Sequence, residues 1–160
     1  RLWSIEVGSV IVTINSRKLK VLKVEDNVDN GMQATAVAPI VDGKLDTSHI
    51  IIAYAGTNQK DFRDIEADVQ SIGLGDTSTV IKGSVGVPET LKKVDTQPKT
   101  AVQFAKKVEE EHPESKFITT GHSLGESLAM FVALKRGYTN ISFNGPDIHN
   151  MIGEEEIVYM

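Results

Sequence analysis

Hydrophobic and polar residues alternate along the first third of the chain. Segments 9–14 (SVIVTI), 19–24 (LKVLKV) and 32–40 (MQATAVAPI) place apolar side chains at every second position, as in strands with one buried face. Residues 49–56 (HIIIAYAG) are apolar at nearly every position, which indicates a central strand covered on both faces. Turn-forming residues separate these segments, so this part of the chain predicts a series of strands.

The spacing changes to that of helices in the rest of the chain. Residues 62–72 (FRDIEADVQSI) and 98–113 (PKTAVQFAKKVEEEHP) repeat apolar positions at intervals of three and four. A short strand over 116–120, a helix over 124–137 and a further strand over 138–145 follow. This alternation of strands and helices predicts an α/β fold with a mostly parallel sheet and helices on both faces.

Residues 73–89 (GLGDTSTVIKGSVGVPE) interrupt this alternation. They are rich in Gly, Ser and Thr, which is typical of a loop. The loop could be a lid over a lipid-binding cleft or an ordinary surface loop.

Composition and charge exclude several classes of protein. Apolar residues make up 40% of the 160 residues and charged residues 24%, as in a globular protein. The net charge is −5 and no Lys/Arg stripe is interleaved with aromatic residues, so nucleic acid is not an expected partner. There is no cysteine, which excludes disulfides, thiolate catalysis and Cys-ligated zinc. The acidic clusters lack the spacing of a calcium loop, so no metal is expected.

The start of the chain bears on localisation. It begins at Arg1, without an initiator methionine and without the pattern of a signal peptide. We interpret it as a processed or trimmed product, and we favour a secreted bacterial protein slightly over a cytoplasmic one.

Ser123 stands between Gly121 and Gly125, after a predicted strand and before a predicted helix. This Gly-X-Ser-X-Gly pattern at a strand-to-helix turn is that of a nucleophile elbow. We expect a strained backbone at Ser123, with glycines where side chains would collide with the neighbouring strand and helix. The N–H of Leu124 would then point toward a developing oxyanion. The alternative is an ordinary turn, because such a short pattern also arises by chance.

Three stretches, in the same order, resemble the class 3 (fungal-type) lipase family, which includes bacterial relatives. HPESKFITTGHSLGESLAMFVAL is similar to the nucleophile segment, IIIAYAGTNQKDFRDIEADV to the third strand and its turn, and ISFNGPDIHN to the strand after the elbow helix. The resemblance covers most of residues 31–150. It implies the α/β-hydrolase fold, with one domain over 1–160, a β-rich part over 1–57 and a nucleophile-elbow part over 98–150.

The resemblance also implies a function, that of a serine hydrolase cleaving carboxylic esters of lipids, either a triacylglycerol lipase or a phospholipase A1-like enzyme. Ser123 is the implied nucleophile, and the N–H groups of Leu124 and Thr57 form the implied oxyanion hole. Ile65 stands at a position that is usually Trp, and Asp68 at a structural aspartate. No cofactor is implied. The expected partners are a lipid or other ester substrate and, transiently, a lipid surface, while a protein partner stays unknown.

The chain also departs from the family pattern. Glu126 stands where a small residue is usual, and Ala55 replaces an Arg. Asp147 and His149 follow Ser123 but lie two residues apart, which is awkward for an acid that must reach the far nitrogen of a base. We therefore expect the catalytic Asp and His beyond residue 160, and an incomplete chain.

Two other functions stay open at this point. The missing relay residues and Glu126 are compatible with a catalytically inactive binding module that kept the fold. An acyl transferase or peptidase is the second alternative, because an elbow with an oxyanion hole serves any acyl transfer.

Overall fold

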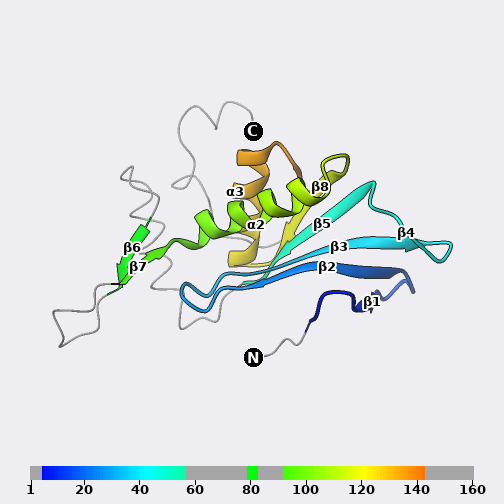
Figure 1. Ribbon diagram of the computed structural model, residues 1–160, viewed down its shortest axis with the longest axis horizontal. Coiled ribbons are helices and arrows are strands. Elements are labelled where there is room, and N and C mark those ends of the chain that lie inside the picture. Colours follow the sequence, from blue (N-terminus) through cyan, green and yellow to red (C-terminus); the bar gives the residue numbers. More distant parts are fainter. Residues whose placement is uncertain (1–4, 57–78, 83–91, 143–160) are drawn as a thin grey trace.

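The computed structural model describes residues 5–56, 79–82 and 92–142, and a single mixed sheet dominates it (Figure 1). The sheet has seven strands in the order β1-β2-β3-β5-β8-β9, with β4 paired to β3. The strands are β1 Val10–Val12, β2 Lys18–Asp26, β3 Gln33–Val41, β4 Lys44–Leu45, β5 His49–Tyr54, β8 Lys116–Gly121 and β9 Thr139–Asn140.

The sheet is antiparallel in its first half and parallel in its second. Strands β1, β2, β3 and β5 pair antiparallel, because short turns connect them and a short connection reverses the chain. Strand β5 pairs in parallel with β8, and β8 in parallel with β9. The predicted parallel pairing is therefore confirmed for β5, β8 and β9. It is wrong for the first half of the sheet, where the strands with alternating hydrophobic and polar residues form antiparallel hairpins.

Two helices in the described part of the chain, α2 (Gln97–Glu111) and α3 (Leu124–Arg136), pack on the same face of the sheet (Figure 1). The Tyr54 hydroxyl donates a hydrogen bond to the Ala101 carbonyl of α2 (2.8 Å), and the Thr119 hydroxyl donates to the Ala129 carbonyl of α3 (2.9 Å). The connections from β5 to β8 and from β8 to β9 both step in the same direction along the sheet. Connections between parallel strands are right-handed, so both helices lie on the same side. The other predicted helix, over residues 62–72, lies outside the described part of the chain. A helix on the other face of the sheet therefore stays a prediction.

The two helices begin and end within two residues of their predicted ranges, 98–113 and 124–137. Pro98 lies in the first turn of α2, and His112 follows its last residue. Gly137 ends α3 in the left-handed conformation, with φ of 71°. Neither helix is long and apolar enough to cross a membrane, nor is any other within the described residues.

The segment predicted as a loop over 73–89 contains a strand, which corrects that expectation. Strand β6 (Thr79–Lys82) pairs antiparallel with β7 (Lys92–Asp95) as a separate two-stranded sheet. Three β-branched residues in a row, TVI, favour the extended backbone despite the surrounding Gly and Ser. The rest of the predicted loop lies outside the described residues, and the single-domain boundaries stay a prediction.

The core lies between the sheet and the two helices. Ile50 and Ile52 of β5 are fully buried against Phe104 and Val108 of α2 and Val132 of α3. The predicted apolar stripe of α2 faces this core as expected. Since β5 is the strand that both helices cover, its carboxyl end is held in a fixed place beside β8.

Glu109 joins the end of α2 to the end of α3. Its carboxylate accepts hydrogen bonds from the guanidinium of Arg136 at 2.7 and 3.1 Å and from the hydroxyl of Tyr138. The Tyr138 ring also stacks on Phe117, with 5.0 Å between centroids. The Tyr138 hydrogen bond and then the Arg136 hydrogen bond hold the pKa of Glu109 below its ordinary value of 4.5.

We predict that Glu109→Gln lowers the free energy of unfolding at pH 7 by about 1 kcal/mol, a modest value because the carboxylate is partly exposed. The ionised carboxylate stabilises the folded state above pH 4.5, and this contribution is lost as the pH falls toward the depressed folded-state pKa. The difference between wild type and variant should therefore vanish in acid. Urea titrations from pH 3 to pH 8 measure it. Glu110→Gln, whose exposed side chain meets Lys106 only at 4.0 Å, is the matched control and should change little.

Candidate active site

Ser123 lies in the turn between β8 and α3, at the carboxyl end of β8. Its side chain is exposed and its backbone has φ of 58° and ψ of −127°. This region of backbone space is sparsely populated by residues other than glycine and costs about 1–3 kcal/mol. The predicted backbone strain at Ser123 is confirmed.

Two glycines make this turn possible. A Cβ atom on Gly121 would overlap the carbonyl group of Gly125 and lie 2.6 Å from the nitrogen of Glu126. A Cβ atom on Gly125 would overlap the carbonyl oxygen of Tyr54, the last residue of β5. Side chains at these positions would thus collide with the helix and with the neighbouring strand, as the sequence predicted.

The amino end of α3 places backbone N–H groups beside Ser123. The Gly125 N–H donates to the His122 carbonyl (3.1 Å) and the Glu126 N–H to the Ser123 carbonyl (3.0 Å). Within the described ranges, no backbone acceptor takes the N–H of Leu124. An unpaired N–H at a helix amino terminus favours a nearby negative charge, so Leu124 stays a candidate oxyanion donor.

The chain that leaves β5 passes directly against the elbow. Tyr54 is in register with Gly121, and a Cβ atom on Gly56 would lie 3.0 Å from the His122 carbonyl and 3.6 Å from the Cβ of Ser123. Thr57, the second predicted oxyanion donor, lies outside the described residues. Its chain neighbour Gly56 is in contact with the elbow, which is consistent with that prediction without testing it.

Other predicted site residues are not described by the structure. Asp147 and His149 lie outside the described ranges, as do Ile65 and Asp68. Glu126 is half-buried in the first turn of α3, immediately after the elbow. Among the described residues, no group of three or more His, Asp or Glu could hold a metal ion.

Two histidines lie at the wrong end of the sheet for this site. His49 begins β5, about 17 Å of strand away from Tyr54 at roughly 3.3 Å per residue. His112 follows the last residue of α2 and precedes β8, so it also lies near the amino end of the parallel strands. His122 is exposed within the elbow itself.

A polar cleft of about 380 Å³ lies between the β2–β3 turn and α2. It is at the same end of the sheet as Ser123, but Ser123 does not line it. Its walls carry the acidic residues Glu25, Asp29 and Asp95, together with Lys107. This cleft could not be predicted from the sequence, because its two sides are far apart in the chain.

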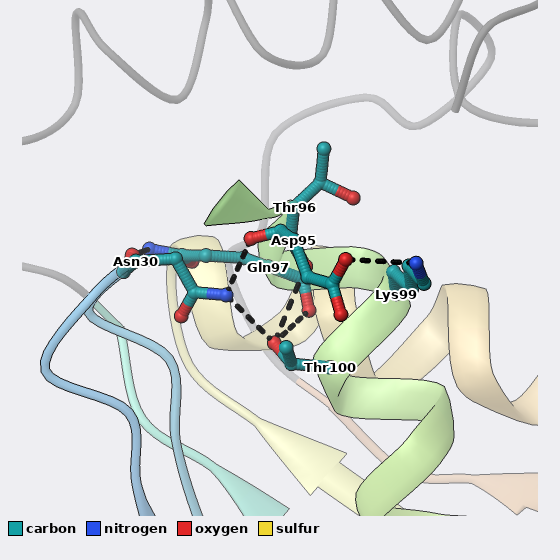
Figure 2. Close-up of polar contacts among 6 residues, drawn as sticks. All are labelled: Asn30, Asp95, Thr96, Gln97, Lys99 and Thr100. Carbon is teal, nitrogen blue, oxygen red and sulfur yellow. Dashed lines mark hydrogen bonds and ion pairs between the residues drawn. The ribbon is translucent and has the colours of Figure 1, made fainter. Parts of the chain in front are cut away.

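A hydrogen-bonded network beside the cleft joins the β2–β3 turn to the start of α2 (Figure 2). The Asn30 side-chain amide donates to the Asp95 carbonyl (2.8 Å) and to the Thr100 hydroxyl (3.0 Å). The Gln97 amide donates to the Asn30 carbonyl (2.6 Å), and the Met32 N–H donates to the Asn30 side chain (3.0 Å). The buried Gln97 Oε1 has no hydrogen-bond partner within the described residues. This network fixes where α2 begins relative to the sheet.

We predict that Gly125→Ala strongly destabilises the fold, by several kcal/mol, because its Cβ would overlap the Tyr54 carbonyl, and overpacking alone typically costs about 1–3 kcal/mol. Thermal unfolding followed by circular dichroism measures the effect. Gly43→Ala is the control for a glycine with open space around it, where only the positive φ of 75° adds strain. Equal destabilisation by the two substitutions would contradict the close contact at Gly125.

We also predict that Asn30→Ala lowers the free energy of unfolding by about 2–3 kcal/mol, because it removes the hydrogen bonds that the Asn30 side chain makes with the Asp95 carbonyl, the Thr100 hydroxyl and the Met32 N–H. Asn15→Ala, at an exposed turn position, should change it by less than about 0.5 kcal/mol. Chemical denaturation of both variants compares the two. A similar small effect at Asn30 would show that the network contributes little to stability.

Comparisons with known proteins find similarity only at the level of solved structures. No family model matches the chain, and no curated protein matches it. Similar solved structures include a lipase from Rhizopus microsporus var. chinensis (17% identity, TM-score 0.42) and a triacylglycerol lipase from Penicillium expansum (14%, 0.42). They also include a propeptide complex of Rhizomucor miehei lipase (20%, 0.40).

These matches cover 80%, 85% and 80% of this chain and 45%, 51% and 41% of those chains, respectively. The chain thus spans about half the length of these lipases, or less. The similar structures are lipases of fungi, and at these identities and TM-scores they assign the chain to no family. A bacterial origin finds no support among them.

Proposed function

We propose that this chain carries the nucleophile of a serine hydrolase that cleaves carboxylic esters of lipids. The observation that supports it is the backbone of Ser123, held at φ of 58° between two glycines whose Cα hydrogens face backbone atoms. Strain of this kind persists only where surrounding structure enforces it, and it clusters at functional sites. An ordinary strand-to-helix turn would need neither the strain nor both glycines.

In the proposed reaction, the Ser123 hydroxyl oxygen attacks the acyl carbonyl of the ester and gives its proton to a histidine base. The carbonyl oxygen becomes an oxyanion, which accepts hydrogen bonds from the N–H groups of Leu124 and Thr57. Loss of one such donor typically costs about 10²–10³ in rate. The intermediate expels the alcohol, which takes the proton, and water then releases the acid from the acyl-enzyme.

The proposal places the base and its acid outside the described residues. His49 and His112 lie at the far end of the sheet from Ser123. Asp147 and His149 stay weak candidates because of their close spacing in sequence. The required geometry is a histidine nitrogen within about 3 Å of the serine oxygen, with a carboxylate on its other nitrogen.

The lipid substrate rests on the resemblance to class 3 lipases in sequence. Triacylglycerols, and phospholipids cleaved as by a phospholipase A1, are the two proposed substrates. Action at a lipid surface and secretion belong to the same proposal. An acyl transferase would use the same elbow and differ only in the acceptor of the acyl group.

We predict that a fluorophosphonate probe adds one adduct to the full-length protein, seen by intact-mass spectrometry, and that Ser123→Ala abolishes it. Ester hydrolysis should fall at least about 10³-fold in the same variant, because the nucleophile is lost. Nitrophenyl esters of short and long acyl chains, triolein emulsions and phospholipid vesicles separate the substrate classes.

Ser48→Ala is the matched control for this experiment. The Ser48 hydroxyl lies 3.2 Å from the Nδ1 of its neighbour His49, so a serine–histidine contact exists there without an elbow. Labelling and hydrolysis should be unchanged in this variant. Labelling lost in Ser48→Ala instead would overturn the assignment of Ser123, whereas an unlabelled but folded full-length protein would favour the binding module. Transfer of the acyl group to added alcohol in preference to water would favour the transferase.

A further inference from the structure

Exposed apolar side chains gather along the outer edge of the sheet, at β1. Val7, Val10, Val12 and Ile14 are 64%, 50%, 61% and 104% exposed. Residues 7–14 contain no charged residue and no proline. Monomeric proteins usually protect their edge strands with charged residues or proline, because the free N–H and carbonyl groups of an unprotected edge can pair with another strand.

The backbone of β1 also turns its free hydrogen-bonding groups outward at two of these valines. The Val21 N–H donates to the Ser9 carbonyl (2.9 Å), and the Thr13 N–H donates to the Arg17 carbonyl (2.8 Å). Hydrogen-bonded positions alternate along an antiparallel strand, so Ser9, Ile11 and Thr13 face β2. The N–H and carbonyl groups of Val10 and Val12 therefore face away from the sheet. No other described strand pairs with β1 on that side.

We propose that β1 pairs antiparallel with β1 of a second copy of this chain, which joins the two sheets across a two-fold axis at Ile11. In this register Val10 of each copy lies opposite Val12 of the other, and the two pairs make four backbone hydrogen bonds. Ile11 faces its own counterpart at the centre, in a non-hydrogen-bonded pair. Ser9 lies opposite Thr13 of the second copy.

A second copy fits this edge because the edge is complementary to itself. The segment Ser-Val-Ile-Val-Thr has nearly the same side chains in both directions, so antiparallel pairing sets valine against valine and hydroxyl against hydroxyl. No pair in this register brings two charges together. Lys18 and Lys20 of β2 lie three strand spacings, or about 14 Å, from those of the second copy, which is beyond the screening length of about 8 Å in physiological salt.

The strand that pairs is short, so the expected association is weak. An interface of a few residues on each side falls below the size of a permanent dimer. We expect a dissociation constant in the micromolar range, roughly 10–100 µM. Dimerisation would then depend on local concentration.

The chain has no cysteine, which allows a direct test of the register with single-cysteine variants of the full-length protein. Cα atoms of a non-hydrogen-bonded antiparallel pair lie about 4.5 Å apart, within the range of a disulfide. Under mild oxidation Ile11→Cys should form a disulfide-linked dimer, seen as a doubled intact mass. A mixture of Ser9→Cys with Thr13→Cys should form the mixed disulfide in preference to either symmetric one.

Val28→Cys is the control, because Val28 is 84% exposed in a turn at the other end of β2. It should crosslink at least 10-fold more slowly than Ile11→Cys. Equal rates would overturn the proposal, as would a preference for Ser9→Cys to crosslink with itself, which indicates a different register.

Sedimentation velocity of the cysteine-free protein from 5 to 500 µM tests the association itself. Val12→Lys, which places a charge at the pairing edge, should raise the dissociation constant at least 10-fold, while Val28→Lys should leave it unchanged. A wild-type protein that stays monomeric over this range overturns the proposal, and so does a dimer that Val12→Lys leaves intact. Circular dichroism confirms that each variant is folded.

Discussion

The contact between the first turn of α3 and the end of β5 governs the arrangement of the site. Gly125 approaches the Tyr54 carbonyl so closely that no side chain fits between them. This approach fixes the distance of α3 from the sheet. It also forces the chain to turn within two residues, His122 and Ser123, between β8 and the helix. Ser123 takes up that turn, which explains its unusual backbone. The strain at Ser123 is thus a consequence of packing the helix against a neighbouring strand, and the six paired residues of β5 and β8 hold it in place.

Local signals in the sequence were sufficient for the two described helices, α2 and α3, and for the backbone of the elbow. Pro98, His112 and Gly137 mark helix ends through backbone preferences that act within a few residues. The spacing of Gly121 and Gly125 also predicted the close packing around Ser123, because both glycines lie within two residues of the serine. Strand identity was also visible in the alternating segments, since one buried face imposes a period of two.

Features that depend on distant partners could not be predicted in this way. Whether neighbouring strands run parallel depends on connections, and the short turns of the first half produce hairpins that the alternation pattern alone did not reveal. Asn30 looks like an ordinary turn residue in sequence, because its partners, Asp95 at the end of β7 and Thr100 in α2, lie dozens of residues away. Strand β6 was hidden by its Gly- and Ser-rich surroundings. The Ser48–His49 contact pairs residues of catalytic type without a strand-to-helix turn, so such a contact alone does not mark an elbow.

Strand β5 belongs to both halves of the sheet, and this has a consequence for the order in which the protein folds. Its pairing with β3 closes a short connection, whereas its pairing with β8 must bring together segments separated by dozens of residues. Short connections close at a smaller entropic cost, so the antiparallel half is expected to form first and to present β5 as a template. The elbow can only assemble after β8 has docked on that template. The strained serine would then be among the last features to form during folding.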